Sequence, residues 1–330
     1  MDVKRAKITA VGHYLPDERI TNHDLEKMVD TNDEWIRTRT GIEERRILRD
    51  PEKATSYMAA KAAQEALDER GMKAEEIDLI IVGTVTPDYL FPATACLVQK
   101  EIGAENAFAF DLSAACSGFL YALTTGSMYI ESGRAKKVLV IGADKMSSIL
   151  DFTDRTTCIL FGDGAGAVIL EESEDGTGII DHKHYTDGDT NCSLYQHAGG
   201  SKNPATKETV EAKQHYVRQD GRAVFKKATM GMADVSLEIM ERNDLEPDEV
   251  AWLVPHQANL RIIDATARRM GLSSEKVMIN INKYGNTTAA TIPLCLYDWK
   301  DQLNHGENIV LSAFGGGFTW GAIYLTWGIK

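Results

Sequence analysis

Three residues of this chain, Cys116, His256 and Asn286, have side chains of types that could act together in acyl-transfer chemistry. A cysteine thiolate attacks thioesters and holds the acyl group covalently. Histidine and asparagine can each donate a hydrogen bond to an oxygen on which negative charge develops. The set therefore indicates a nucleophile with two groups that stabilise an anion.

Cys116 lies in the sequence DLSAACSGF, between an apolar run at residues 107–110 and a small-residue segment at residues 119–130. This pattern predicts a strand, a turn that carries the cysteine, and a helix. A thiol at a helix N-terminus has a lowered pKa, since the helix dipole and free N–H groups favour the thiolate. A buried structural cysteine is the alternative. It is the interpretation we adopt for the remaining cysteines, which are Cys96, Cys158, Cys192 and Cys295.

His256 and Asn286 have similar positions relative to predicted elements. His256 follows an apolar strand at residues 250–254, and Gln257 and Asn259 come directly after it. Ligands gather at the carboxyl ends of strands in open α/β sheets; a histidine that caps the next helix is the alternative. Asn286 lies in KYGNTTAA, which we interpret as the end of a strand, a small-residue turn and the start of a helix.

The elements that must position these residues follow an α/β pattern. Short apolar runs rich in β-branched residues predict strands that are buried on both faces. They occupy residues 77–85, 107–110, 137–142, 165–170, 250–254, 277–281 and 308–313. Between them lie helical patterns, such as residues 55–70, which end at Gly71, a typical C-terminal helix cap. Alternating strands and helices predict an α/β fold.

An internal repeat indicates two related halves. The segment that starts at Ala66 (ALDERGMKAEEIDLI) resembles the segment that starts at Ile239 (IMERNDLEPDEVAWL), and Asn286 follows Cys116 by 170 residues. We therefore divide the chain into residues 1–175, with the cysteine, and residues 176–330, with the histidine and asparagine. A pseudo-twofold axis would bring the two turns face to face. Chance similarity of generic α/β units is the alternative.

Residues 186–222 interrupt this repeat with a long polar segment. Long ordered loops in compact domains are often lids or binding loops, and a passive linker is the alternative.

Two glycine-rich segments have different meanings. Residues 162–166 (GDGAG) precede a strand, whereas a dinucleotide-binding loop precedes a helix, so we reject nicotinamide-cofactor binding there. Residues 315–317 are three glycines between two predicted strands. Glycines there would let the backbone approach a neighbouring group closely and present an N–H to an oxyanion. A simple tight turn is the alternative. His182 and His184 are expected to be solvated, and we predict neither a metal nor a cofactor.

Composition excludes several classes of protein. The chain has 330 residues with 36 Lys and Arg against 49 Asp and Glu, a net charge of −13. Such a balance argues against nucleic-acid binding and against adsorption to an anionic membrane. The N-terminal segment lacks the apolar region of a secretory signal, and no apolar run reaches the length of a membrane helix. We expect a cytoplasmic protein without membrane insertion.

Several sequence blocks together resemble the β-ketoacyl-acyl-carrier-protein synthase III family of thiolase-fold condensing enzymes. The blocks are residues 31–46, 111–119, 154–157, 161–166, 254–261, 284–287 and 313–321, and the resemblance covers essentially the whole chain. It implies an α/β, thiolase-like fold in which two pseudo-symmetric halves form αβαβα layers. Elongating relatives use two histidines where this chain has His256 and Asn286.

The resemblance also implies a two-stage reaction that initiates fatty-acid synthesis. Cys116 would take the acyl group of a short acyl-CoA, with the backbone N–H groups of Cys116 and Gly316 as the oxyanion hole. Malonyl-acyl-carrier protein would then lose CO2, and His256 and Asn286 would hold the resulting enolate. The condensation would release 3-ketoacyl-carrier protein, CO2 and CoA. Acyl-CoA is thus a substrate, not a cofactor.

The resemblance assigns binding residues as well. Those expected to contact CoA are Thr31, Trp35, Arg39, Arg155, Phe225 and Asn259. Those of the acyl pocket are Met146, Phe161 and Phe314, with Phe91 supplied across a homodimer interface. Those facing the carrier protein are Lys226, Lys227, Gln257, Ala258, Asn259, Leu260, Arg261, Arg268 and Arg269. A solvated helix face is the alternative for the charged residues. Because residues 186–222 border the pocket in the resembling enzymes, the starter acyl group stays open between acetyl, branched and longer chains.

Three other functions would use some of the same residues. A related thiolase-fold acyltransferase with a product other than a fatty acid would share the same three residues. A papain-like cysteine hydrolase uses Cys, His and Asn in this order, but the Cys116 segment lacks the local signature of that class. A non-catalytic acyl-CoA-binding scaffold would leave Cys116 unmodified.

Overall fold

The computed structural model describes residues 4–188 and 192–330. Residues 1–3 of the predicted first half and residues 189–191 of the polar segment lie outside the described residues.

The first half of the chain forms a five-stranded mixed sheet with the strand order β1-β7-β6-β4-β5. Its strands are β1 (Ala6–Tyr14), β4 (Leu79–Gly83), β5 (Phe108–Leu112), β6 (Lys137–Asp144) and β7 (Gly164–Glu172). β6, β4 and β5 are parallel, whereas β7 is antiparallel to both of its neighbours. β4 is buried along its whole length, as its continuous run of apolar residues predicts.

The second half forms a four-stranded sheet with the strand order β11-β12-β13-β8. Its strands are β8 (Gly178–Thr186), β11 (Val250–Pro255), β12 (Asn308–Gly315) and β13 (Thr319–Thr326). β11 and β12 are parallel, and β13 is antiparallel to β12 and β8. Read from the other end, this is the order and direction of β1, β7, β6 and β4. The equivalence supports the division into two halves.

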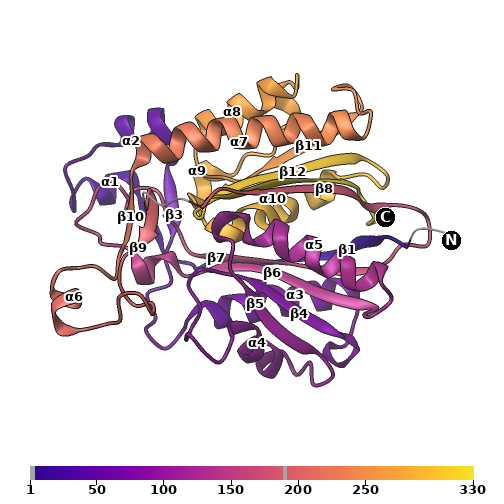
Figure 1. Ribbon diagram of the computed structural model, residues 1–330, viewed down its shortest axis with the longest axis horizontal. Helices are drawn as coiled ribbons and strands as arrows, with labels where there is room; N and C mark the ends of the chain where they lie inside the picture. Colours follow the sequence, from indigo (N-terminus) through magenta and orange to yellow (C-terminus); the bar gives the residue numbers. More distant parts are fainter. Residues whose placement is uncertain (1–3, 189–191) are drawn as a thin grey trace.

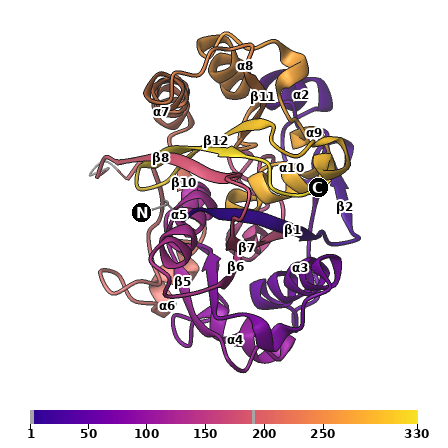
Figure 2. The same ribbon diagram turned by 90° about the vertical axis from the view of Figure 1, so that its right-hand side faces the viewer.

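The helices and sheets alternate as five layers (Figures 1 and 2). α3 (Thr55–Arg70) and α4 (Thr94–Ile102) cover the outer face of the first sheet, and α7 (Gly221–Arg242) and α8 (Leu260–Arg269) cover the outer face of the second. α5 (Gly118–Glu131) and α10 (Thr291–Trp299) lie between the sheets, in an apolar core to which both halves contribute. The expected αβαβα layering is confirmed.

Smaller elements form a cap at one end of the layers, on the left of Figure 1. They are β2 (Arg19–Thr21), α1 (Asn22–Leu25), α2 (Asp33–Thr40), β3 (Glu44–Arg46), β9 (Leu194–Gln196), α6 (Lys207–Glu211), β10 (Val217–Gln219) and α9 (Ile281–Tyr284). β9 and β10 form a two-stranded antiparallel sheet within the polar segment at residues 186–222, which is therefore not a bare linker.

Two local predictions have different outcomes. α3 has the predicted bounds and ends at Gly71, whose φ of 64° is a left-handed cap conformation that glycine adopts without strain. The predicted strand at residues 277–281 is wrong: only Val277 bridges to Leu253, and the chain then enters α9. The strand expected before Asn286 is therefore a short helix.

Within the described part of the chain, we find no helix that is both long enough and apolar enough to cross a membrane.

Candidate active site

Cys116 lies in a tight turn between the first sheet and the central layer. The turn, η2 (Ala115–Ser117), leads directly into α5, so the predicted place of the cysteine at a helix N-terminus is confirmed. Ala115 has a φ of 48°, an uncommon conformation for a residue with a side chain. Thr319 Oγ1 donates to the Ala114 carbonyl at 2.9 Å and Ser117 Oγ donates to the Thr319 carbonyl at 3.0 Å. The second half thus fixes the turn that carries the cysteine.

The protonation state of Cys116 differs from the sequence-based expectation. Burial, together with the nearby Asp144 carboxylate, raises the pKa of the thiol to about 12. A lowered pKa was expected from the helix dipole, and that expectation is wrong. The free energy needed to remove a thiolate from water is larger here than the stabilisation that the helix N-terminus provides. The thiol is neutral at pH 7 and needs a proton acceptor when it reacts.

His256 is directly beyond the carboxyl end of β11, as predicted. Its backbone N–H donates to the Ser312 carbonyl of β12 at 2.7 Å, which ties the residue to the sheet. The side chain is buried, and burial lowers the pKa of the imidazole to about 3. The ring is therefore neutral at pH 7. Nδ1 lies 2.7 Å from Oγ1 of Thr291, the first residue of α10.

Hydrogen bonds from its side chain and from its own backbone N–H and carbonyl hold Asn286 in place. Oδ1 accepts the Thr288 N–H at 2.9 Å, so the Nδ2 group is the end that remains for a ligand. The Asn286 N–H donates to the Leu160 carbonyl, and its carbonyl accepts the Gly162 N–H. Asn286 thereby bridges to Phe161, next to the predicted acyl pocket.

A buried carboxylate in the first half clamps the Asn286 turn. Asp144 accepts hydrogen bonds from the Thr288 hydroxyl and the Ala289 N–H in the second half, and from the Thr84 and Thr86 hydroxyls in the first. Burial raises the pKa of Asp144 despite these bonds. Thr288 has a φ of 53°, a strained conformation that the clamp helps to hold.

Glycines allow the backbones of the two halves to meet at this point. A Cβ atom on Gly142 would lie 2.2 Å from the Ala289 carbonyl oxygen, and a Cβ atom on Gly315 would lie 2.6 Å from the Cys116 nitrogen. Neither space accepts a methyl group without displacement of the backbone. The residues that carry Cys116 and Asn286 are thus brought together across the pseudo-twofold interface that the repeat predicts.

Cys116, His256 and Asn286 line one cavity of about 620 Å³. Nine other residues that were predicted for the site also line this cavity: Trp35, Arg39, Arg155, Phe161, Phe225, Ala258, Asn259, Arg261 and Phe314. A cavity of this size matches the range of small-molecule and cofactor sites. Nucleophile, imidazole and amide therefore share one ligand-accessible space.

Arginine side chains gather where the cavity opens. Arg39, Arg155, Arg222 and Arg261 are exposed and line the cavity. The guanidinium carbons of Arg39 and Arg155 lie 5.1 and 5.5 Å from the centre of the Trp35 ring. A flat aromatic group with phosphates would find both a stacking surface and positive charge here.

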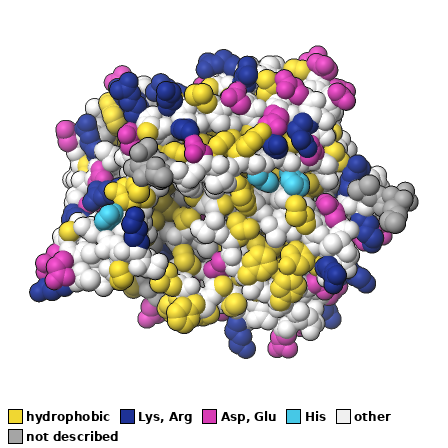
Figure 3. Space-filling view, in the orientation of Figure 1, with side chains coloured by type: hydrophobic (Ala, Val, Ile, Leu, Met, Phe, Trp, Pro, Cys, Tyr) yellow, Lys and Arg dark blue, Asp and Glu magenta, His cyan; other side chains and the backbone are white. Residues whose placement is uncertain are grey.

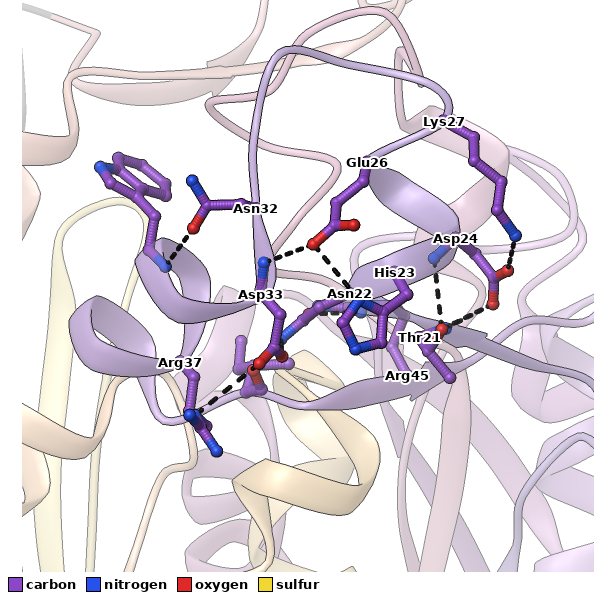
Figure 4. A network of polar contacts seen from close by, with 12 residues as sticks. Thr21, Asn22, His23, Asp24, Glu26, Lys27, Asn32, Asp33, Arg37 and Arg45 are labelled. Carbon is purple, nitrogen blue, oxygen red and sulfur yellow. Dashed lines mark hydrogen bonds and ion pairs between the residues drawn. The ribbon is translucent and has the colours of Figure 1, made fainter.

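The cap segment that carries Trp35 is anchored by a polar network (Figure 4). Asn32 caps α2 by accepting the Trp35 N–H at 2.8 Å. The buried Arg45 donates to Oδ1 of Asn22 at 3.0 Å and to the Ile159 carbonyl at 2.7 Å. Asn22 in turn donates to Asp33 at 2.9 Å. The network connects the start of α2 to the loop that precedes Phe161.

The polar segment at residues 186–222 forms one wall of the cavity, through Leu194 and Gln219 among others. It is fixed to the loop before Arg155 by ion pairs: Arg218 contacts Asp154 at 2.7 Å, and Lys213 contacts Asp151 at 3.2 Å. This anchoring supports its interpretation as a binding segment.

Some predicted site residues lie elsewhere. Gln257 is fully buried. Its Nε2 donates to the Pro255 and Met278 carbonyls, and its Oε1 accepts the Asn280 and Ile281 N–H groups. The predicted contact of this side chain with the carrier protein is therefore wrong. His184, expected to be solvated, is largely buried against Thr124, and burial lowers its pKa to about 4. The remaining predicted residues that do not line the cavity are Thr31, Phe91, Met146, Lys226, Lys227, Leu260, Arg268, Arg269 and Gly316.

The predicted residues that do not line the cavity have identifiable surroundings in the structure. Gly315, rather than Gly316, lines the cavity beside Cys116, while Gly316 lies against Leu194. Met146 packs in a buried cluster with Phe161, one residue removed from the cavity wall. Phe91 is 86% exposed, which leaves it free for a contact outside its own chain. Lys227 pairs with Asp187, and Arg269 pairs with Asp234 at 3.3 Å.

Sequence reasoning missed several of the lining residues, including one set on a single helix. Val224, Ala228 and Met232 project from α7 into the cavity beside Phe225. Their spacing of four residues is a helical stripe, so the periodicity of the segment could have revealed them.

The chain matches one family over both halves. Residues 110–188 match the family model described as 3-oxoacyl-[acyl-carrier-protein (ACP)] synthase III, and residues 240–327 match the model of its C-terminal part. A β-ketoacyl-[acyl-carrier-protein] synthase III of Chlorobium phaeovibrioides is 62% identical over 98% of this chain and 99% of its own length. A protein of the same name from Porphyromonas gingivalis is 54% identical over 99% of this chain and 98% of its own length.

Solved structures give the same result. The 3-oxoacyl-[acyl-carrier-protein] synthase III of Aquifex aeolicus is 48% identical, covers 98% of this chain and 100% of its own, and has a TM-score of 0.90. The priming β-ketosynthase from the R1128 polyketide biosynthetic pathway also has a TM-score of 0.90, at 32% identity over 98% of this chain and 96% of its own.

Proposed function

The chain belongs to the 3-oxoacyl-[acyl-carrier-protein] synthase III family, and on that premise we propose how its residues carry out the condensation of an acyl-CoA with malonyl-acyl-carrier protein. It is a condensing acyltransferase that initiates fatty-acid synthesis. One observation supports the residue assignments above all: Cys116, His256 and Asn286 line a single cavity with an arginine-lined opening.

In the first half-reaction, Cys116 attacks the thioester carbonyl of the acyl-CoA. Because the Cys116 thiol is neutral, its proton moves to a lone pair on His256 Nε2 as the sulfur attacks. The backbone N–H groups of Cys116 and of the Gly315–Gly316 segment hold the oxyanion. The C–S bond to CoA breaks, and the departing sulfur takes the proton from Nε2. CoA leaves as a thiol, and the acyl group stays on Cys116.

In the second half-reaction, malonyl-carrier protein occupies the same cavity. The C–C bond to its carboxylate breaks, CO2 leaves, and the bonding electrons form an enolate. Nδ2 of Asn286 donates to the enolate oxygen, since Oδ1 is already bonded to the Thr288 N–H. The enolate carbon attacks the acyl-Cys116 carbonyl, and the sulfur leaves. The overall step consumes one proton from solvent, which restores the Cys116 thiol.

The opening of the cavity suits CoA. The adenine would stack on Trp35 by displacing the guanidinium of Arg39 or Arg155, which then remains beside the phosphates. Asn259 and Phe225 line the cavity and would contact the pantetheine arm. The Asn259 side chain also caps α8 and donates to the Arg39 carbonyl at 2.9 Å, so it additionally positions that arginine's backbone.

A homodimer would complete the site. β5 is at the edge of the first sheet and carries the exposed Phe108, while Tyr89, Leu90 and Phe91 are exposed in the loop between β4 and α4. Figure 3 shows hydrophobic side chains gathered on this part of the surface. An unpaired apolar edge of this kind fits a second copy of the chain. The protein would then be a cytoplasmic homodimer in which Phe91 reaches the partner subunit's acyl pocket.

Intact-mass measurement after incubation with a panel of acyl-CoAs tests the catalytic assignment. We expect the mass of one acyl group to be added for each accepted starter, with the adduct mapped to Cys116 and absent from Cys116→Ala. Subsequent addition of malonyl-carrier protein should remove the adduct and give 3-ketoacyl-carrier protein. Failure to form any adduct on Cys116 would contradict the proposal and favour an acyl-CoA-binding scaffold.

A second candidate function has one supporting observation, the 32% identical priming β-ketosynthase of a polyketide pathway. Condensation rates with malonyl-loaded carrier proteins of fatty-acid and of polyketide synthesis separate the two functions, because both would give the same kind of 3-ketoacyl product. The relatives of 52–62% identity bear the name β-ketoacyl-[acyl-carrier-protein] synthase III, and they favour the first function.

A further inference from the structure

The Thr291 hydroxyl makes a buried contact with the side of His256 that faces away from the cavity. Both residues are almost completely buried. Thr291 Oγ1 lies 2.7 Å from His256 Nδ1 and donates to the Thr288 carbonyl at 3.0 Å. Thr291 lies outside the sequence blocks that resemble the family, and the proposed condensation gives it no role.

The direction of these hydrogen bonds determines which ring nitrogen carries the proton. Thr291 Oγ1 is within hydrogen-bonding distance of the Thr288 carbonyl, which can only accept, and of His256 Nδ1, which can donate or accept. Both bonds form together only when the hydroxyl donates to the carbonyl and Nδ1 carries the proton. The second nitrogen, Nε2, keeps its lone pair. Because burial keeps the ring neutral at pH 7, only one nitrogen carries a hydrogen before the reaction begins.

We propose that Thr291 is a positioning residue that keeps a proton on Nδ1 of His256, so that Nε2 is the nitrogen at which protons enter and leave in both half-reactions. This inference rests on the proposed function of the same site. In acylation, Nε2 accepts the thiol proton and passes it to CoA. In condensation, Asn286 Nδ2 holds the enolate oxygen, and Nε2 relays the solvent proton that the reaction consumes to the Cys116 sulfur as that sulfur leaves. Nδ1 keeps its proton throughout.

The proposal separates acylation from decarboxylation. Thr291→Val keeps the shape of the side chain but leaves Nδ1 without an acceptor. A buried donor without a partner is costly, so the ring should shift to the tautomer with the proton on Nε2. That form cannot accept the thiol proton. It can still donate to an enolate oxygen.

Half-reaction kinetics test this difference. For Thr291→Val, we expect acylation of Cys116 by acyl-CoA to slow by at least about tenfold, because general bases contribute about 10²–10⁴-fold. Decarboxylation of malonyl-carrier protein should slow less. Thr291→Ser, which retains the hydroxyl, should restore acylation. Equal losses in both half-reactions, or no loss of acylation, would overturn the proposal.

The chain offers a matched control. Thr124 Oγ1 contacts Nε2 of His184 at 2.8 Å and is also buried, but neither residue lines the cavity. Thr124→Val removes a comparable hydroxyl–imidazole contact, and we expect it to leave acylation unchanged. A similar loss in Thr124→Val would assign the effect to general destabilisation and overturn the specific role of Thr291.

A spectroscopic measurement on the wild-type enzyme is independent of activity. With ¹⁵N-labelled histidine, His256 is identified among the eight histidines by its loss in His256→Asn. We expect its Nδ1 to give the resonance of a protonated nitrogen and its Nε2 that of an unprotonated one. The reverse assignment would overturn the proposal even if Thr291→Val does not fold. If instead wild-type Cys116 accepts no acyl group, the proposed function fails while the tautomer is still read directly.

Discussion

At the scale of single residues, the site has a neutral thiol and a neutral imidazole. Burial raises the pKa of Cys116 to about 12 and lowers the pKa of His256 to about 3. Desolvation disfavours the charged form of each group, so the two shifts have the same cause and opposite directions. The reactive ion pair therefore forms only during the reaction, and the resting site stores no thiolate.

The first residue-scale prediction concerns the nucleophile. Cys116→Ser should reduce condensation by at least about 10³-fold, because a serine hydroxyl is far harder to ionise than a thiol and loss of a nucleophile has effects of this size or larger. The measurement is the rate of 3-ketoacyl-carrier protein formation, with the acyl adduct followed by mass. Retention of more than a few per cent of the rate would exclude Cys116 as the nucleophile.

The second prediction concerns pH. The pKa of His256 is about 3 in the folded chain against an ordinary value of 6.5, so the unfolded chain binds more protons between these values. The free energy of unfolding should therefore fall as the pH is lowered from about 6.5, with a slope of at most about 1.4 kcal/mol per pH unit from this residue.

Urea unfolding at about pH 7, 6 and 5 measures this slope. Other groups also titrate in the range, so the informative quantity is the difference between wild type and His256→Asn. The variant should lose less stability on acidification. Parallel curves for the two proteins would show that burial does not depress the His256 pKa.

At the scale of elements, strands and their terminal turns decide where the reactive groups lie. Apolar runs in the sequence correctly predicted β4, β6, β7, β11 and β12, because strands buried on both faces must be continuously apolar. The segment at residues 277–281 has the same composition but forms only one bridge, since tertiary packing turns the chain into α9. Composition alone does not distinguish these outcomes.

The element-scale prediction tests the approach of β12 to the Cys116 turn. Gly315→Ala should lower the rate of Cys116 acylation by about tenfold or more, because a Cβ atom there would lie 2.6 Å from the Cys116 nitrogen and displacements of about 1 Å can cost about 10²-fold. Gly200→Ala is the matched control, since its Cβ atom would meet nothing within 4 Å. Equal acylation rates in the two variants would show that this close approach does not position the nucleophile.

At the scale of the whole molecule, charge is distributed unevenly. The chain has a net charge of −13, yet Arg39, Arg155, Arg222 and Arg261 surround the opening of the cavity. Positive charge at the mouth of an otherwise acidic protein can steer phosphates and an acidic carrier protein to the site. It does so without promoting binding to nucleic acid over the rest of the surface.

The corresponding prediction is a dependence on salt. Raising the salt concentration from about 0.05 to about 0.5 M should increase KM for malonyl-carrier protein several-fold while changing kcat little, because exposed charges are screened over a few ångströms at high salt. Arg261→Ala should raise KM at low salt and flatten the dependence. A KM that does not change with salt would count against a basic docking surface.

The sequence by itself determined the α/β class and the repeat, and it indicated Cys116, His256 and Asn286 as candidates, because these depend on local apolar patterns and on residue types at the ends of strands. The layered arrangement was expected from the family resemblance. The tertiary structure decided the remainder. It buried Gln257, placed Gly315 beside the nucleophile, and set Thr291 behind His256. It also made the thiol and the imidazole neutral, since a pKa depends on desolvation by residues far apart in the sequence, which meet only when the two halves pack together.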